Sequence, residues 1–360
     1  MNRLKTALTY GCIFATACLL LGWTFRSDIA LVLAKRAITR NVALEPLTQL
    51  PDGLHVALCG TGSPFPDPQR AGPCTAVIAG SRMFVVDAGT GAGRNLQRMR
   101  LPIGSIEAVL LTHFHSDHID GLGELLLQRW ISNANSVPVQ VIGPVGVEAV
   151  VGGLMSAYSQ DRDYRVAHHG AYVVPPSGFG AKAQAFKLDK AANSVVLFKD
   201  SDLEILAFEV DHGPVKPAMG YLFRYKGRSV LISGDTRKSA NLEAHAAGVD
   251  VLLHEALAPN LVSEIGGIAQ AAGRPALAQI MSDIQNYHTT PSEAAQIAQN
   301  AKVGLLVFNH IVPPIPLSAL EDLFLQDARQ RYSGALRIGQ DGDFISLPAA
   351  GGAFTLSSRL

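Results

Sequence analysis

HFHSDH, at residues 113–118, puts four metal-binding side chains within six residues, directly after an apolar run. Residues two apart on a strand point the same way, so His113 and His115 share a direction at the strand end. Asp117 and His118 begin the following helical turn and can face a second point nearby. One turn can therefore supply ligands to two neighbouring cations. Imidazole and carboxylate ligands at this density favour zinc and do not exclude iron or manganese.

Short apolar runs alternate with helical segments on both sides of this turn. The runs are HVALCG, CTAVIAG, MFVVDAG and AVLLT in the first half, and LEILAFEV, MGYLFRY, SVLISGDT, VDVLLHEA and VGLLVFNH in the second. The pattern predicts an α/β fold, with helices near residues 91–98, 239–247 and 319–331, another helix from Pro291, and a loop over 174–180. Two such halves packed sheet to sheet, with the helices outside, would form a four-layer αββα sandwich.

The HxHxDH pattern resembles the signature of the metallo-β-lactamase superfamily. CGTGSPFP at 59–66, SGDT at 233–236, HEA at 254–256 and HTT at 288–290 resemble motifs of its ribonuclease Z and arylsulfatase-like branch. The similarity covers about residues 54–348. It implies a zinc-dependent hydrolase acting on ester bonds, with the sandwich fold as its domain. We therefore divide the chain into an N-terminal signal-anchor or signal peptide, a linker, the hydrolase domain and a C-terminal tail, at 1–26, 27–53, 54–348 and 349–360.

The resemblance also implies a ligand set for two Zn²⁺ per chain. One ion would be held by His113, His115 and His212, the other by Asp117, His118 and His310, and Asp235 would bridge the two. The later ligands each follow a strand-like run, and strand ends converge on one rim of a sandwich. Alone, His212 or His310 would more often be a hydrogen-bonded strand-end histidine than a ligand. The doublet His168-His169 is the rival third ligand, although no buried strand precedes it.

Two ions about 3.5–4 Å apart lower the pKa of a shared water toward about 7 and polarise a phosphoryl or sulfuryl oxygen. We predict that Asp117 also orients or deprotonates this water. His288 is the candidate proton donor, because it lies just before a helix start marked by an N-cap threonine, a first-turn proline and a capping-box glutamate. The alternative is a solvent-facing loop histidine. His254 and Glu255 are expected to orient ligands or His288.

Charge bears on the choice of substrate. The chain carries 30 Lys and Arg and 30 Asp and Glu. In ribonuclease Z a basic arm follows the HxHxDH turn; here Ile119 to Asp211 holds seven Lys and Arg against eleven Asp and Glu, a net charge of −4, which argues against a nucleic-acid partner. The first hypothesis is therefore cleavage of small-molecule phosphodiesters or sulfate esters by a metal-bound hydroxide. The alternative is a ribonuclease Z-like tRNA 3′-processing endonuclease. A β-lactamase and a non-catalytic zinc-binding membrane protein are weaker alternatives.

The N-terminal run Ala7–Trp23 contains no charge and follows Arg3 and Lys5. At about 1.5 Å per residue it nearly crosses a hydrocarbon core of about 30 Å, and it is long for a cleaved signal. We therefore predict a membrane-anchored or exported chain with a periplasmic or extracellular catalytic domain; cleavage of a signal peptide is the alternative. The basic residues after the run point the other way, because positive charge favours the inside.

Cys12 and Cys18 lie in the apolar run, and Cys59 and Cys74 lie at two predicted strand ends. Export would allow Cys59 and Cys74 to form a disulfide, and otherwise they would be buried thiols. The resemblance also admits a homodimer.

Overall fold

The computed structural model describes residues 10–11, 14–16, 21–42, 47–189 and 193–360. The chain divides into two units, Met1–Glu45 and Pro46–Leu360. The first contains α2, Arg26–Val42, in the part of the chain that we expected to be a linker. The second contains all the strands and is described below.

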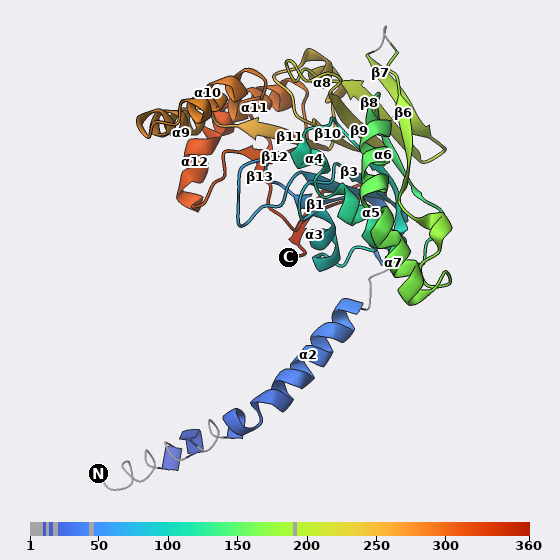
Figure 1. Cartoon of the computed structure of the whole chain (residues 1–360). Helices are drawn as coiled ribbons and strands as arrows, with labels where there is room; N and C mark the ends of the chain where they lie inside the picture. Colours follow the sequence, from blue (N-terminus) through green and yellow to red (C-terminus); the bar gives the residue numbers. More distant parts are fainter. Residues whose placement is uncertain (1–9, 12–13, 17–20, 43–46, 190–192) are drawn as a thin grey trace, which may run out of the picture. The chain divides into compact units, whose positions relative to one another are not determined.

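Two mixed sheets form the centre of the second unit (Figure 1). The first has eight strands in the order β15-β14-β1-β2-β3-β4-β5-β6, and the second has seven in the order β13-β12-β11-β10-β9-β8-β7. In chain order the strands of the first sheet are Gly53–Gly60, Cys74–Ala79, Arg82–Val86, Ile106–Leu110, Val139–Pro144, Ala181–Phe186, Asp343–Pro348 and Thr355–Ser358. Those of the second are Ser194–Lys199, Leu203–Glu209, Met219–Tyr225, Arg228–Ile232, Val251–Leu257, Leu305–Val312 and Ala335–Ile338.

Alternating apolar residues explain why the two sheets pack face to face. One buried cluster joins Leu54 and Val56 of β1 to Phe223 of β9 and Val230 of β10. Separate buried clusters lie on the outer face of each sheet, where helices cover it. Burial of each apolar side chain contributes about 1.5–3 kcal/mol relative to its exposure. The predicted four-layer αββα sandwich is confirmed.

Most of the helices form the two outer layers, and some project from them. On the first sheet lie α3, α4, α5, α6 and α7, at Ala92–Arg98, Ser116–Ile119, Leu122–Ser132, Val147–Ala157 and Ser159–His169. With the second sheet go α8, α9, α10, α11, α12 and α13, at Ala240–His245, Pro259–Ala271, Pro275–Asp283, Pro291–Asn300, Glu321–Leu325 and Ala328–Arg331. The α9–α10 hairpin projects from this layer (Figure 1).

In each sheet, four neighbouring strands run parallel to one another. β3, β4, β5 and β6 run parallel in the first sheet, and β10, β11, β12 and β13 do so in the second. Carboxyl ends of parallel strands share an edge, and ligands bind outside that edge in α/β sheets. Both sheets therefore present residues that follow their strands to one rim.

Several expected segments differ from the structure. The segment 349–360, expected to be a tail, contains β15, which pairs antiparallel with β14. The single helix expected near 319–331 is two short helices, α12 and α13, because Gln326 between them takes a left-handed φ of 52°. The loop expected over 174–180 contains one short 3₁₀ turn, Pro176–Gly178.

The structure does not support the predicted N-terminal membrane segment. Of the apolar run Ala7–Trp23, residues 7–9, 12–13 and 17–20, which include Cys12 and Cys18, lie outside the described residues. No single helix in the described part of the chain has the length and apolar character to cross a membrane. Cys59 and Cys74, in contrast, form a disulfide between β1 and β2, with 5.0 Å between their Cα atoms.

Candidate metal centre

The predicted metal ligands gather at the rim where the parallel strands end. The ligand atoms of His113, His115, His212 and Asp235 lie within 4.8 Å of one another, and so do those of Asp117, His118 and His310. His113 and His115 follow β4, whereas Asp117 and His118 lie in the first turn of α4. The tight turn thus separates two pairs of ligands, as the spacing predicts.

Asp235 lies between the two groups. Its Oδ2 is 3.4 Å from His118 Nε2 and 3.3 Å from His310 Nε2 on one side. It is 3.9 Å from His113 Nε2 and 3.8 Å from His212 Nε2 on the other. A carboxylate in this position can offer an oxygen to each of two neighbouring cations.

A bulge in β12 directs His310 into the site. The pairing of β11 with β12 shifts between Glu255 and Ala256, so that His310 has no partner on β11. His310 takes φ 46°, a left-handed conformation that few residues other than glycine adopt. A bulge of this kind re-aims a side chain near a functional site. Ile311 N donates a hydrogen bond to Thr61 O, which fastens the bulge to the loop after β1.

Three imidazoles and one carboxylate of the cluster have protonation states that suit cation binding. His118 differs, because burial lowers its pKa but Asp235 and Asp87 outweigh that effect and raise it well above the usual value. Burial lowers the pKa of His113, His115 and His212, so each imidazole is neutral near neutral pH. Burial alone would raise the pKa of Asp235, but His310 and His118 outweigh it and hold that pKa well below its usual range. Neutral imidazole and ionised carboxylate are the forms that bind metals.

Orphaned polar atoms indicate that these residues fit a metal. Among the described residues, His118 Nε2 and Asp235 Oδ1 are buried without a hydrogen-bond partner. A buried polar group without a partner costs about 1–3 kcal/mol, which a bound cation would recover. The donor set of imidazoles and carboxylates is the one that zinc prefers.

Contacts behind the ligands fix their orientation. His118 Nδ1 is 2.8 Å from Asp87 Oδ2, and Thr112 donates its backbone N–H and its hydroxyl to the same carboxylate. His212 Nδ1 is 3.0 Å from Tyr287 O. Such contacts select the tautomer that leaves Nε2 to face the cation. Sequence reasoning missed Asp87; its signal was a carboxylate directly after the apolar run MFVV, at the end of β3.

His288 lies beside the cluster, next to Glu255. Its Nδ1 is 3.1 Å from Glu255 Oε1, which also accepts hydrogen bonds from Thr236 N and Thr289 N. Burial lowers the pKa of His288, but Glu255 outweighs it and raises that pKa to about 8. The predicted capping box forms at Thr290, the N-cap of α11, two residues after His288. Ligand atoms of His288, Asp235 and His310 also lie within 4.8 Å of one another.

The other histidines that the sequence offered lie elsewhere. His168 and His169 occupy the last turn of α7, are exposed, and belong to neither ligand group. His254 is buried in β11, and its Nδ1 lies 2.8 Å from Glu255 O. His254 therefore packs behind Glu255 and does not enter the ligand groups.

Comparisons with known proteins agree with this geometry. Residues 82–311 match the family model described as "Beta-lactamase superfamily domain". The chain belongs to the metallo-β-lactamase superfamily. Membership in this superfamily implies binding of a divalent metal, and the His and Asp clusters lie where the motif predicts.

Relatives of this superfamily member include proteins named ribonuclease Z. That of Mycobacterium marinum is 34% identical over 80% of this chain and 96% of its own length. That of Mycolicibacterium paratuberculosis is 36% identical with the same coverage. Among solved structures, the short form of human tRNase Z matches with a TM-score of 0.59 at 22% identity, over 82% of this chain and 99% of that one. The metallo-β-lactamase fold protein YhfI of Bacillus subtilis matches with a TM-score of 0.57 at 18% identity, over 82% and 100%.

These relatives change two expectations. They favour the ribonuclease Z alternative over the small phosphodiester or sulfate ester of our first hypothesis. They also contradict the prediction of a membrane-anchored or exported protein, which rested on the N-terminal run alone. The names of these relatives thus point away from the substrate class that the acidic balance of residues 119–211 favoured.

Proposed function

We propose that this chain is a two-zinc phosphodiesterase that cleaves nucleic-acid phosphodiester bonds in the manner of ribonuclease Z, with a tRNA precursor as candidate substrate. The observation that carries the proposal is the convergence of seven candidate ligands, in two groups joined by Asp235. Names of relatives that align over nearly their whole length support the substrate class.

The two ligand groups would each hold one Zn²⁺. When bound, the ions supply Lewis acidity to the phosphoryl oxygen and a water activated near neutral pH. Asp117 Oδ2 lies 3.2 Å from His310 Nε2 and 3.5 Å from His118 Nε2, so this carboxylate belongs to one ligand group. Asp117 also lines the large cleft beside the centre. We therefore propose that Asp117 orients the attacking water and accepts its proton.

His288 is the proposed proton donor to the leaving oxygen. With a pKa of about 8, its imidazole carries the required proton at neutral pH. Glu255 holds Nδ1, which leaves Nε2 to face the ligand groups. An in-line displacement would require this donor to reach the leaving oxygen on the side of the phosphorus opposite the attacking water.

An RNA substrate needs a cationic surface, and α7 supplies little of one. Arg162 pairs with Asp163 at 2.8 Å, and Arg165 pairs with Asp161 at 2.7 Å. These two arginines therefore bring no net positive charge to α7, because a neighbouring aspartate matches each of them. We expect the main contacts with RNA phosphates to involve cations elsewhere on the molecule.

The test combines metal content with turnover in one preparation of the full chain. We would measure zinc by mass spectrometry and assay a tRNA precursor with a 3′ trailer, bis-p-nitrophenyl phosphate and p-nitrophenyl sulfate. We expect about two zinc ions per chain and cleavage of the precursor. Asp235→Asn should lower its turnover by at least about a hundredfold, because it weakens both metal sites. His168→Ala, which changes a histidine outside the ligand groups, is the matched control.

Two results would contradict the proposal. If the protein binds no metal, the proposed metal-dependent hydrolysis is excluded. Turnover of the sulfate ester alone would instead support the sulfate esters named in our first hypothesis. Cleavage of bis-p-nitrophenyl phosphate without cleavage of the precursor would retain the phosphodiesterase and exclude the tRNA substrate.

A further inference from the structure

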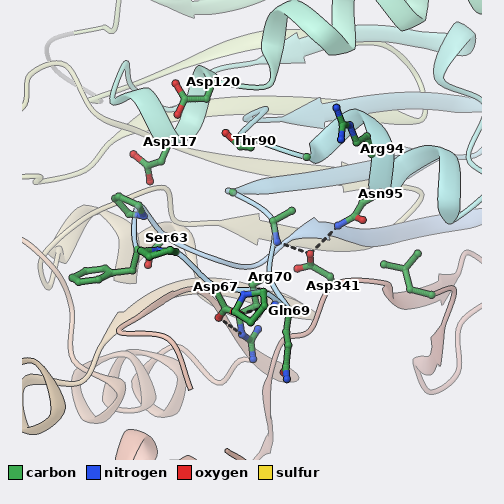
Figure 2. Close-up of a pocket in the computed structure, with 18 of the residues that line it drawn as sticks. Ser63, Asp67, Gln69, Arg70, Thr90, Arg94, Asn95, Asp117, Asp120 and Asp341 are labelled. Atoms are coloured by element: carbon green, nitrogen blue, oxygen red, sulfur yellow. Dashed lines mark hydrogen bonds and ion pairs between the residues drawn. The ribbon is translucent and has the colours of Figure 1, made fainter. Parts of the chain in front are cut away.

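A cleft of about 710 Å³ opens beside the metal centre, and Asp117 is part of its wall. Its size falls within the range of about 300–1,000 Å³ that is typical of ligand sites. The loop after β1 forms one wall, and α3 with Thr90 forms the other. Figure 2 shows Asp117 and Asp120 at one end of this cleft and Arg94 with Asn95 at the other. A substrate that reaches Asp117 can therefore extend toward α3.

The first wall is a preorganised loop. Its segment PFPDPQR, residues 64–70, contains three prolines, each of which fixes its own φ near −65°. One carboxylate joins both ends of the loop, because Asp341 accepts hydrogen bonds from Thr61 N, Thr61 Oγ1 and Ala71 N. The wall thus keeps its shape before a ligand arrives.

The second wall presents two arginines. Residues of α3 that face the core are buried, and among them Asn95 donates to Cys59 O and to Asp341. Arg94 and Arg98, one turn apart, are exposed and line the cleft. Arg94 meets Glu124 in an ion pair 3.1 Å long, with 76% of its side chain exposed. Arg98 donates to Asn95 Oδ1, a neutral acceptor.

The charges of the cleft leave these arginines available to an anion. Of the other charged residues in the wall, Asp67 pairs with Arg70 at 3.8 Å. The carboxylate of Asp341 accepts hydrogen bonds from backbone N–H groups of the loop. Asp117 is a candidate metal ligand, and Asp120 lies with it at the end of the cleft away from Arg94 (Figure 2). An exposed ion pair such as that of Arg94 contributes little, so a phosphate can replace its carboxylate partner.

We propose that the cleft is a subsite for the phosphate next to the scissile one, and that Arg94 and Arg98 bind it. The inference rests on the proposed cleavage of nucleic-acid chains, in which phosphates recur along the substrate. Guanidinium groups bind phosphate through paired, charge-assisted hydrogen bonds. The site selects oligonucleotides over esters with a single phosphate. It also supplies the cationic contact that α7 lacks.

The experiment compares the uridine trinucleotide UpUpU, which has a second phosphate, with the dinucleotide UpU, which has only the scissile one. In the zinc-loaded full chain, we expect kcat/KM to be higher for UpUpU. In the double variant Arg94→Ala/Arg98→Ala, the UpUpU to UpU ratio should fall about tenfold or more, because a charge-assisted hydrogen bond is lost at each position. The dependence of kcat/KM for UpUpU on salt concentration should also become weaker in the double variant, because one contact with a phosphate is lost.

Arg224→Ala is the matched control, because Arg224 also forms an exposed ion pair with a glutamate, Glu204, but lies on β9 outside the cleft. It should keep the wild-type ratio and salt dependence. An unchanged ratio and salt dependence in the double variant would overturn the proposal.

Binding separates this subsite from the proposed function. If the protein turns over neither nucleotide, the proposed function fails, and fluorescence anisotropy with labelled UpUpU still tests the subsite. Weaker binding by the double variant than by the wild type and Arg224→Ala supports the subsite. Equal binding by all three overturns it.

Discussion

Asp87 shows how one carboxylate behind a candidate ligand, His118, can set the geometry of the candidate metal centre. It contacts His118 Nδ1 and accepts two hydrogen bonds from Thr112, all within the core below the HFHSDH turn. Asp87 itself has φ 57°, so the chain turns sharply at the end of β3 to place it there. A strained residue at this point is consistent with a role in positioning the metal ligands.

Asp87→Asn should therefore weaken zinc binding by about 10–100-fold, because His118 loses the partner that orients its ring. A titration against a chelator of known affinity would measure the change. Asp163→Asn, at an exposed aspartate of α7, should leave the zinc affinity unchanged. Equal affinity of the Asp87 variant and the wild type would show that the ring of His118 is oriented by other contacts.

Glu255 should control the pH dependence of turnover through His288. The proton donor must be protonated, so activity is present below its pKa and is lost as pH rises through it. Since Glu255 raises that pKa to about 8, Glu255→Gln should move the alkaline limb of the kcat profile to lower pH. Profiles of kcat against pH, with zinc content checked at each point, would measure the shift. A limb that stays in place would exclude His288 as the titrating donor.

At the scale of elements, one connection was hidden from sequence reasoning. The turn between β13 and β14 reaches the loop after β1 through Asp341, although about 270 residues separate Asp341 from Ala71. Burial raises the pKa of Asp341, which its hydrogen bonds oppose. No local pattern around QDGD, residues 340–343, indicates that Asp341 closes a distant loop.

Asp341→Asn should raise KM for UpUpU more than it lowers kcat, because the loop wall moves while the metal ligands stay. It should also destabilise the protein by about 1–3 kcal/mol through lost buried hydrogen bonds. Steady-state kinetics and urea unfolding would measure the two effects. Asp250→Asn is a fitting control, because Asp250 likewise accepts from a backbone N–H and a hydroxyl, those of Ser229, away from the cleft. A similar KM in both variants would mean that Asp341 acts on stability alone.

The disulfide joins the same loop from its other side. Cys59 and Cys74 are separated by 15 residues, which include the whole proline-rich segment. Closing a loop of about 15 residues stabilises a folded chain by about 3 kcal/mol. Cys59→Ala/Cys74→Ala should lower the free energy of unfolding by roughly that amount, and dithiothreitol should do the same to the wild type but not to the variant. Urea titrations with and without reductant would measure it; a wild type indifferent to reductant would contradict the prediction.

At the scale of the whole molecule, the metal centre joins the two sheets. His113 follows β4 of the first sheet, whereas Asp235 follows β10 and His310 lies in β12 of the second. Bound cations would therefore hold the two sheets together at one rim. A ligand that binds only the folded state stabilises it in proportion to its affinity.

Zinc should accordingly raise the melting temperature of the protein stripped with EDTA. Free zinc at a thousand times its Kd contributes about 4 kcal/mol. Calorimetry at several zinc concentrations would measure the shift. In Asp235→Asn the shift should be much smaller, and in His168→Ala it should remain. A melting temperature independent of zinc in the wild type would contradict binding at this rim.

The sequence by itself determined the alternation of strands and helices, the four-layer sandwich and the residues of the HFHSDH turn. These features depend on local periodicity and on neighbours in the chain, which the sequence displays directly. The α9–α10 hairpin was not predicted, because its helices are inserted between β11 and α11 and pack mainly on each other.

The resemblance already indicated His212, Asp235, His310 and Glu255, but only the tertiary structure revealed Asp87 and Asp341. Asp87 contacts His118 across 31 positions of the sequence, and Asp341 contacts Ala71 across 270. The sequence around each aspartate does not show a partner at such a distance. The tertiary structure was likewise needed to exclude His168 and His169 as metal ligands, because a histidine on an exposed helix and one at a strand end differ only in what surrounds them. The net charge of residues 119–211 does not decide the substrate class for the same reason: phosphate binding depends on where cations gather in space, and a segment's net charge does not record that.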